Sequence, residues 1–341
     1  MREIKINQQT EGTKLLRKLT NVLPDASLGF IHKMLRKKNI TLKDSKADGN
    51  EILKNGDVVK IFFSDETFDK FAGSKEADMT EAREVPVLDP ERVIYEDDEI
   101  ILVNKPSDML SQKAGKDDIS MVEIIVNYTR CNDGFKPAVA NRLDRNTSGI
   151  IAAGKTVKGL KFLSDGFKKR EFEKYYLCPV AGVIKAPRLF NGLWSKDSHG
   201  NKVRIKDVGW KPEEGRAFPK EYFVKGNIPV QTAVYHVKDN GEITLLKVEL
   251  LSGKSHQIRA QLSEAGFPLI GDHKYGRRNV NDHFKRKYGI EYQLLHAYML
   301  EIPGKGLFFA DLPERFKSFL QGEDLWVHGI QEVFEDQRLR I

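Results

Sequence analysis

The spacing of hydrophobic residues near the start of the chain is helical. Apolar side chains fall on one side of a helix predicted over 14–23, at Leu15, Leu16, Leu19, Val22 and Leu23. A second helix is predicted from Ser27 to about Lys38, and its apolar face consists of Phe30, Ile31, Met34 and Leu35. Short strands are predicted over 40–42 and, after a Gly-Asp turn, over 58–62. We therefore expect a small α/β module over residues 1–63.

Strand patterns dominate after residue 90 and are mixed with helical ones. Strands are predicted over 93–95, 100–103, 175–183, 232–237 and 243–251, and helices over 120–129, 157–168 and 256–265. The two kinds do not alternate regularly, which favours an α+β domain over a doubly wound parallel sheet. The polar segment 188–229, rich in Lys and Gly, is a candidate hairpin insertion that touches substrate.

A change in composition separates these two parts. Residues 64–90 hold 3 basic and 8 acidic residues, and the segment closes with Pro86 and Pro90. Few large apolar side chains occur from Ala72 to Glu84, as expected for a linker. The predicted organisation is a small module over 1–63, an acidic linker over 64–90 and a larger domain over 91–341.

Positive charge is concentrated outside the linker. Residues 1–63 hold 13 basic and 7 acidic residues, and the formal net charge of the chain is +7. A basic surface suits a polyanion, because binding releases condensed counterions. The polar face of the second predicted helix carries our candidate RNA-binding residues, Lys33, Arg36, Lys37 and Lys38. The alternative, an ordinary solvated helix face, stays open.

Several classes of protein are disfavoured by what the sequence lacks. No apolar run approaches the roughly 20 residues of a transmembrane helix, and the N-terminus lacks the apolar core of a signal peptide, so we expect a cytoplasmic protein without a membrane partner. Cys131 and Cys178 are far apart in sequence and predict reduced thiols. The spacing of His256, His273 and His296 matches no common zinc pattern, so no metal site is predicted.

A short polar turn offers the first candidate for chemistry. Asp144 lies between Arg142 and Arg145, just before the apolar stretch 150–153. Nearby positive charge favours the ionised carboxylate, which is then ready to act as nucleophile or base. A plain salt-bridged turn is the alternative.

A second candidate lies in the helix predicted over 256–265, with Ser255 as its expected cap. Arg259 adjoins the apolar face of this helix, and a partly buried Arg requires a carboxylate; Asp144 is the expected partner. Gly253-Lys254-Ser255 is not the end of a phosphate-binding P-loop, because Val248 stands where that motif needs its first glycine.

These motifs together resemble those of the RluA-type pseudouridine synthases. The family form His-Arg-Leu-Asp-x-x-Thr-Ser-Gly is matched by residues 141–149, with Asn141 in place of the His. Arg-Thr-His-Gln-Ile-Arg is matched by 254–259, and the downstream Gly-x-Pro-Ile-x-Gly-Asp-x-x-Tyr-Gly by 266–276. Glu173 to Leu177 aligns the family's active-site tyrosine with Tyr176. The match over 95–106 is looser, because Asp108 follows where a Gly is common.

The front of the chain has its own resemblance. Residues 30–44, together with 53–57, resemble an S-four-type RNA-binding domain, whose second helix and following strand present basic residues to structured RNA. The resemblances together cover nearly the whole chain.

The resemblance implies a catalytic domain with a mixed, mostly antiparallel sheet and a central cleft. It implies isomerisation of uridine to pseudouridine in RNA, without metal or other cofactor. Asp144 would attack the nucleoside or deprotonate its sugar, Arg259 would hold the carboxylate, and Tyr176 would stack on the uracil and help remove the C5 proton. The base must first be flipped out of its stack. Arg142 is a candidate wedge for the gap, or an ordinary partner of a phosphate or carboxylate.

The similarity is closest to members that modify large-subunit ribosomal RNA, so that RNA is the expected partner of a monomeric enzyme. Two other functions stay open. The substrate is tRNA in one, and in the other the chain is a non-catalytic RNA-binding ribosome-assembly factor. The joint presence of Asp144, Tyr176 and Arg259 favours a catalytic function over the non-catalytic one.

Overall fold

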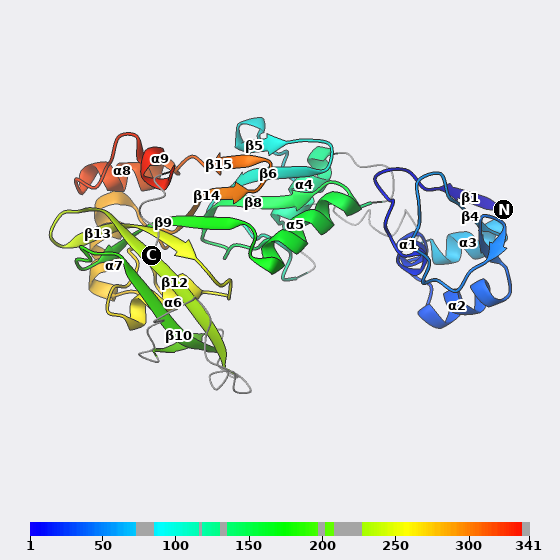
Figure 1. Cartoon of the computed structure of the whole chain (residues 1–341), viewed down its shortest axis with the longest axis horizontal. Helices are drawn as coiled ribbons and strands as arrows, with labels where there is room; N and C mark the ends of the chain where they lie inside the picture. The colour runs from blue at the N-terminus through cyan, green and yellow to red at the C-terminus, as the bar shows by residue number, and fades with distance from the viewer. Residues whose placement is uncertain (73–84, 116–117, 130–134, 197–201, 208–226, 336–341) are drawn as a thin grey trace. The chain divides into compact units, whose positions relative to one another are not determined.

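The helical spacing near the N-terminus produces α1 (Leu15–Val22) and α2 (Leu28–Arg36), as predicted. Ser27 caps α2, because its hydroxyl accepts the Phe30 N–H at 3.2 Å. Four short antiparallel strands form a sheet in the order β1 (Arg2–Lys5), β4 (Val58–Ile61), β2 (Ile40–Leu42) and β3 (Ser45–Lys46). The elements are drawn in blue in Figure 1.

A further helix, α3 (Asp65–Phe71), lies in the segment for which the composition predicts a linker. Phe68 is buried and belongs to the same hydrophobic cluster as Leu19 of α1 and Ile31 of α2. At least this start of the predicted linker is therefore folded onto the N-terminal core. The computed structural model describes residues 1–72, 85–115, 118–129, 135–196, 202–207 and 227–335, so most of the predicted linker from 73 onward lies outside the described residues.

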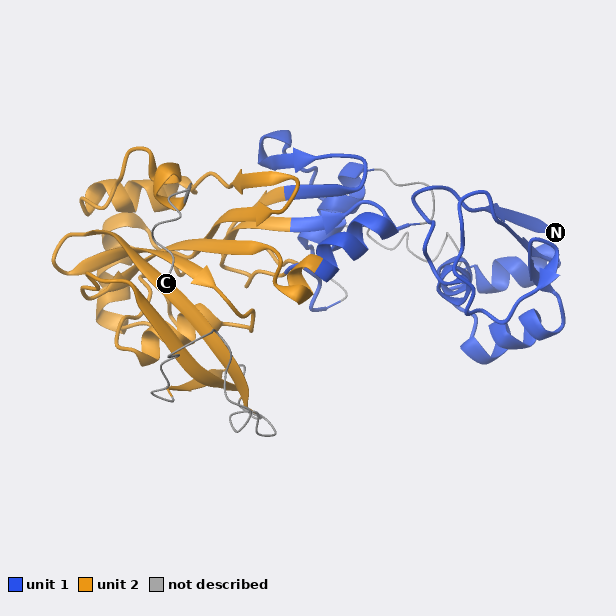
Figure 2. Cartoon of the chain, viewed as in Figure 1, with its two compact units in different colours: residues 1–102, 112–141, 152–165 blue, residues 103–111, 142–151, 166–341 orange. Residues whose placement is uncertain are grey.

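The chain divides into two compact units (Figure 2). Unit 1 consists of residues 1–102, 112–141 and 152–165, and unit 2 of 103–111, 142–151 and 166–341. Helices α4 (Met121–Thr129) and α5 (Val157–Lys169) begin within one residue of their predicted positions. Among the described residues, no helix is long and apolar enough to cross a membrane.

Eleven strands of the described residues form the large sheet. Its main path is β11 (Val203–Asp207), β10 (Arg188–Lys196), β12 (Ile228–Asp239), β13 (Ile243–Leu250), β9 (Glu173–Ala181), β14 (His296–Ile302), β8 (Ser148–Gly154), β6 (Ile100–Lys105) and β5 (Val93–Glu96). β15 (Gly306–Phe309) pairs with β14, and β7 (Ala138–Val139) with β8. The pairs from β11 to β14 are antiparallel, whereas β14 and β8 are parallel. The predicted α+β class with a mixed, mostly antiparallel sheet is confirmed; the central cleft stays a prediction.

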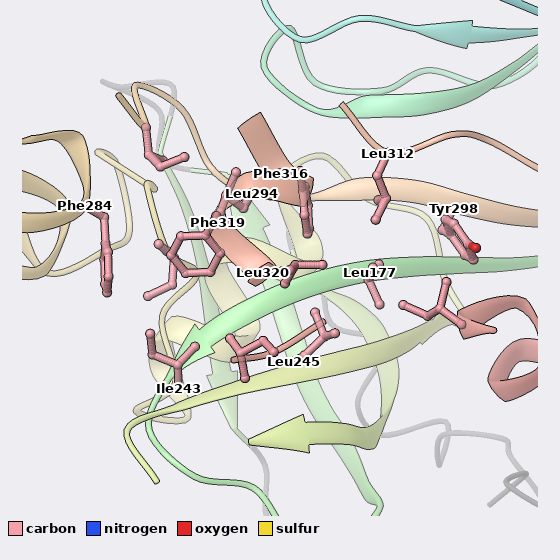
Figure 3. Close-up of a cluster of buried hydrophobic side chains, with 14 of the residues drawn as sticks. Leu177, Ile243, Leu245, Phe284, Leu294, Tyr298, Leu312, Phe316, Phe319 and Leu320 are labelled. Atoms are coloured by element: carbon pink, nitrogen blue, oxygen red, sulfur yellow. The ribbon is translucent and has the colours of Figure 1, made fainter. Parts of the chain in front are cut away.

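The core of unit 2 lies between the sheet and three C-terminal helices (Figure 3). The helices are α7 (Arg278–Tyr288), α8 (Glu314–Gly322) and α9 (Ile330–Glu335). Phe284 of α7 and Phe319 of α8 pack with Leu177 of β9 and Leu245 of β13 in one buried cluster. This packing fixes β9, which carries Tyr176, and β14, which pairs with β8 just after Asp144.

The segment 188–229 contains the hairpin expected from its sequence. β10 and β11 are antiparallel, with Trp194 opposite Ile205. The parts of this segment at 197–201 and 208–226 lie outside the described residues.

Candidate active site

Asp144 lies in unit 2, in the loop that leads into the fully buried strand β8. β8 pairs in parallel with β14 through Ser148 opposite His296 and Gly149 opposite Ala297. Gly149 has φ +110°, and a Cβ there would lie 2.3 Å from the Ala297 carbonyl oxygen. Glycine is therefore required for the two strands to approach, five residues after Asp144.

Two buried polar side chains hold the Asp144 loop. The Lys105 ammonium donates hydrogen bonds to the carbonyls of Pro106, Met109 and Arg145 at 2.7–2.9 Å. Burial lowers the pKa of Lys105 to about 7, although the charge of Asp144 opposes this shift. Ser111 accepts the Leu143 N–H at 3.0 Å and donates to the Leu143 carbonyl at 2.8 Å. The backbone on both sides of Asp144 is thus tied down.

The strand after the loop is fixed by a buried histidine. His296 contacts the Ser148 hydroxyl through Nδ1 at 2.8 Å and the Ala310 carbonyl through Nε2 at 3.1 Å. Burial lowers the pKa of His296 to about 4, so the ring is neutral at pH 7. Nε2 must then carry the proton that it donates to Ala310, and Nδ1 accepts from Ser148. The role of His296 is therefore structural.

Arg259 joins Asp144 to a second carboxylate. It belongs to α6 (Gln257–Glu264), and its side chain is 9% exposed. Nη1 donates to Asp144 Oδ2 at 2.9 Å, which confirms the predicted pairing. Nε and Nη2 donate to the two carboxylate oxygens of Asp272 at 2.7 and 2.9 Å. This bidentate contact fixes the guanidinium plane and therefore the direction of its bond to Asp144.

Asp272 is the functional residue that sequence reasoning missed. Its side chain is fully buried, and Oδ1 also accepts the backbone N–H groups of Lys274 and Tyr275. Burial raises the pKa of Asp272, but the Arg259 hydrogen bonds and charge outweigh this effect and the pKa is lowered. The signal was present in the Gly-Asp-x-x-Tyr-Gly match, but the motif alone did not show which group faces Arg259.

The two oxygens of the Asp144 carboxylate are not equivalent. Oδ2 receives the Arg259 hydrogen bond and lies 3.9 Å from His256 Nε2. Oδ1 has no hydrogen-bond or ion-pair partner among the described residues, and the side chain is 23% exposed. One oxygen is therefore anchored and the other is available to react.

Tyr176 lies on β9, opposite Ala297 of β14 and Val248 of β13. The side chain is buried, and burial followed by the nearby charge of Asp144 raises its pKa. Across the described parts of the chain, no hydrogen bond to its hydroxyl is found. Asp144, Arg259 and Tyr176 all belong to unit 2, where Arg259 binds Asp144 and the charge of Asp144 acts on Tyr176.

The predicted cap of α6 is wrong. The N-cap residue is His256 rather than Ser255, with φ 57° and ψ 16° and without a side-chain capping bond. This left-handed conformation turns the His256 ring toward Asp144, 3.9 Å away, and toward the Tyr275 hydroxyl, 3.0 Å away. Helix α6 therefore lacks a side-chain capping hydrogen bond, and the His256 side chain contacts Asp144 and Tyr275 instead.

The remaining predicted residues lie elsewhere. Arg142 is exposed and makes no hydrogen bond or ion pair with any described residue. Lys33, Arg36, Lys37 and Lys38 are exposed residues of unit 1, on and just after α2. Asn141, which replaces the family's His, accepts the Ala152 N–H through Oδ1 at 2.8 Å and so secures the chain entering the Asp144 loop.

Comparison with known proteins agrees with this geometry. The family described as RNA pseudouridylate synthase matches residues 99–264. An uncharacterised RNA pseudouridine synthase of Mycoplasma genitalium is 28% identical, over 87% of this chain and 88% of its own. Ribosomal large subunit pseudouridine synthase D of Borreliella burgdorferi is 26% identical, over 85% of both chains. The solved structure of human RNA pseudouridylate synthase domain containing 4 shares the fold, with TM-score 0.57, 17% identity and coverage of 70% of this chain and 94% of its own.

A mixed sheet that holds an arginine-anchored carboxylate, in a chain with these relatives, defines an isomerase that acts on RNA. Over most of its length the chain is similar to RNA pseudouridine synthases of the RluA type.

Proposed function

We propose that this enzyme converts specific uridines of large-subunit ribosomal RNA to pseudouridine, with Asp144 as the reacting carboxylate. The observation that carries the proposal is the asymmetry of that carboxylate: Arg259 anchors Oδ2, and Oδ1 has no partner among the described residues. The ion pair keeps the group charged and oriented without occupying the oxygen that has to react.

The chemistry requires one bond to break and another to form between the same two rings. When N1–C1′ breaks, Asp144 Oδ1 either bonds to the sugar or removes a sugar proton. The base then turns over and C5 bonds to C1′, as the Asp144–sugar bond breaks or Asp144 returns the sugar proton. The C5 proton is then lost while N1 gains one. Tyr176 is the proposed group against which the uracil stacks and which helps remove the C5 proton. It lies near enough to Asp144 for that charge to raise its pKa, and its hydroxyl is unpaired in the described structure.

A paired uridine has to leave its stack before it can reach Asp144, at a cost of a few kcal/mol. Arg142 lies two residues before Asp144, is exposed, and has no partner among the described residues. We propose that it fills the space left by the flipped base. The alternative role, a contact to a phosphate, also uses a free guanidinium.

Large-subunit ribosomal RNA is proposed as the substrate for two reasons. Relatives over 85–86% of the chain carry the names ribosomal large subunit pseudouridine synthase C and D. Within the described residues, Lys33, Arg36, Lys37 and Lys38 form no ion pair, whereas Lys43 and Lys60 of the same module are paired with Asp57 and Asp44. Unpaired exposed cations suit a phosphate backbone.

The proposed organisation is an S-four-type RNA-binding domain over 1–63, a connecting segment over 64–90 whose helix α3 packs on that domain, and the catalytic domain over 91–341. We propose a monomer that acts in the cytoplasm and needs no cofactor. A tRNA substrate and a non-catalytic role in ribosome assembly are the alternatives that the following experiment separates.

Pseudouridine mapping tests the proposal. Ribosomal RNA and tRNA from cells with and without the gene are treated with carbodiimide, and the stops of primer extension are compared. A ribosomal stop that disappears with the gene and returns with the wild-type copy, but not with Asp144→Asn, supports the proposal. A stop that changes only in tRNA contradicts the ribosomal substrate, and unchanged maps of both favour the non-catalytic role.

A further inference from the structure

His256 has an unusual backbone for its position. It is the N-cap residue of α6, with φ 57°, and its side chain makes no capping hydrogen bond. A non-glycine residue in this region is uncommon and costs about 1 kcal/mol or more. Ser255, a good capping residue, immediately precedes it. The conformation instead serves to place the imidazole beside Asp144.

Tyr275 determines which ring nitrogen of His256 carries the proton. The Tyr275 hydroxyl accepts the Val203 N–H at 3.0 Å and lies 3.0 Å from His256 Nδ1. We assign the tautomer in which the hydroxyl accepts from Val203 and donates its own proton to Nδ1. The neutral imidazole therefore carries its hydrogen on Nε2, the nitrogen that lies 3.9 Å from Asp144 Oδ2.

The charged groups that face His256 are two carboxylates and two cations. Burial lowers the pKa of His256; Asp144 and Asp272 oppose this, and Arg259 and Lys274 add to it. Tyr275 contributes its hydroxyl and packs edge-on against the imidazole. The ring is neutral at pH 7, and its side chain is 21% exposed.

The buried cations around Asp144 have their donors engaged. All three ammonium protons of Lys105 are directed at carbonyl oxygens, and Arg259 is bound through three nitrogens to Asp144 and Asp272. The distance of 3.9 Å from His256 Nε2 to Asp144 is too long for a direct hydrogen bond. The Nε2–H of this partly buried side chain thus adjoins the reacting carboxylate and has no hydrogen-bond partner among the described residues.

We propose that His256 is a further catalytic residue, whose Nε2–H donates a hydrogen bond to a carbonyl oxygen of the uracil as the glycosidic bond breaks. The inference rests on the proposed function of Asp144. Cleavage of N1–C1′ leaves the bonding pair on the uracil, shared by N1 and the carbonyl oxygens. A donor aimed at this charge stabilises the transition state more than the substrate. Formation of C5–C1′ uses an electron pair of the ring, and loss of the C5 proton restores it.

The test combines enzyme variants with altered substrates. Short RNAs that span the mapped target contain uridine, 2-thiouridine or 4-thiouridine at the target position, because sulfur is a poor acceptor. Single-turnover rates are measured for wild type, His256→Ala, His256→Gln and His256→Asn. The Gln amide nitrogen can occupy the place of Nε2, whereas the shorter Asn keeps the tolerance for a left-handed backbone but cannot reach that place.

On uridine, His256→Ala and His256→Asn are expected to be about 100-fold slower than wild type and His256→Gln to lose less than about ten-fold, with RNA affinity unchanged. One of the two thio substitutions should slow wild type but not His256→Ala, since both changes remove the same hydrogen bond. Equal rates for wild type and His256→Ala, or additive losses with both thio substrates, overturn the inference. No product from wild-type enzyme would instead contradict the proposed function itself.

Discussion

Arg259 Nη1 donates to Asp144 Oδ2 at 2.9 Å, while the opposite edge of the same guanidinium is bound by buried Asp272. The direction of the bond to Asp144 is thus set by Asp272, on the far side of the arginine. One cation between two carboxylates leaves Asp144 Oδ1 without a partner among the described residues, and this oxygen is the basis of the proposed chemistry.

Removal of Arg259 should cost both stability and activity. Arg259→Ala leaves Asp272 buried without its cation, and breaking a buried ion pair costs about 3–5 kcal/mol of unfolding free energy. Adding Asp272→Asn removes the buried charge and should recover part of that free energy, but not the activity, because Asp144 still lacks its anchor. Chemical denaturation and single-turnover assays measure the two effects separately.

Arg278→Ala is the matched control for this prediction. Arg278 is 94% exposed and lies 3.7 Å from Asp282 on the same helix, so its loss should cost less than about 1 kcal/mol. An Arg259→Ala protein that is as stable and as active as this control would contradict the role given to the Arg259 bridge.

Gly149→Ala should displace the Asp144 loop. The new Cβ would meet the Ala297 carbonyl oxygen at 2.3 Å, and the φ of +110° is itself strained for alanine. We expect a loss of at least about 2 kcal/mol in stability and a large loss of activity. Gly241 also has a positive φ, but a Cβ there would meet no atom within 4 Å. Comparing the melting temperatures of Gly149→Ala and Gly241→Ala therefore separates the cost of backbone strain from the cost of the steric clash.

Stability should depend on pH through His296. Its pKa falls from about 6.5 in the unfolded chain to about 4 in the folded protein, so the unfolded chain binds the proton more readily. The stabilisation is complete above pH 6.5 and is lost as the pH falls toward 4. The shift corresponds to roughly 3 kcal/mol.

Denaturation curves between pH 4 and 7 measure this dependence. His296→Gln, which can still donate to the Ala310 carbonyl, should be less stable at pH 7 but show a flatter profile than wild type. Parallel profiles for the two proteins would show that the charge on His296 does not govern acid stability.

The basic face of α2 should contribute affinity rather than turnover. Replacing Lys33, Arg36, Lys37 and Lys38 by Gln is expected to weaken RNA binding and to reduce the slope of log K against log salt by up to about 3. The rate constant at saturating enzyme should not change. Lys60→Gln removes a cation already paired with Asp44 and Glu3, and it should leave the slope nearly unaltered.

The sequence predicted those features that local pattern or residue chemistry determines. Strand β9 with Tyr176 and helix α6 with Arg259 follow from hydrophobic spacing. The Arg259–Asp144 pair followed from the rule that a buried arginine needs a carboxylate, although 115 residues separate the two.

Other features depend on contacts that spacing does not encode. Asp272 faces Arg259 only because the chain turns back after α6, and His256 displaces Ser255 from the capping position because Asp144 and Tyr275 lie beside it. Helix α3 lies in an acidic segment with linker composition, but Phe68 and Phe71 pack against the N-terminal core. In each of these three places, contacts with residues distant in sequence determine the structure, and the local sequence pattern does not predict it.

The central claim is that Asp144 carries the reaction while Arg259 only holds it. Its most direct test is the single-turnover rate of Asp144→Asn on an RNA that spans the mapped target, beside wild type. The amide keeps the size of the side chain and can still accept from Arg259, so the fold and RNA affinity should persist. We predict a loss of at least roughly 1,000-fold in the rate of pseudouridine formation. A rate near that of wild type would contradict the assignment of Asp144 and the mechanism based on it.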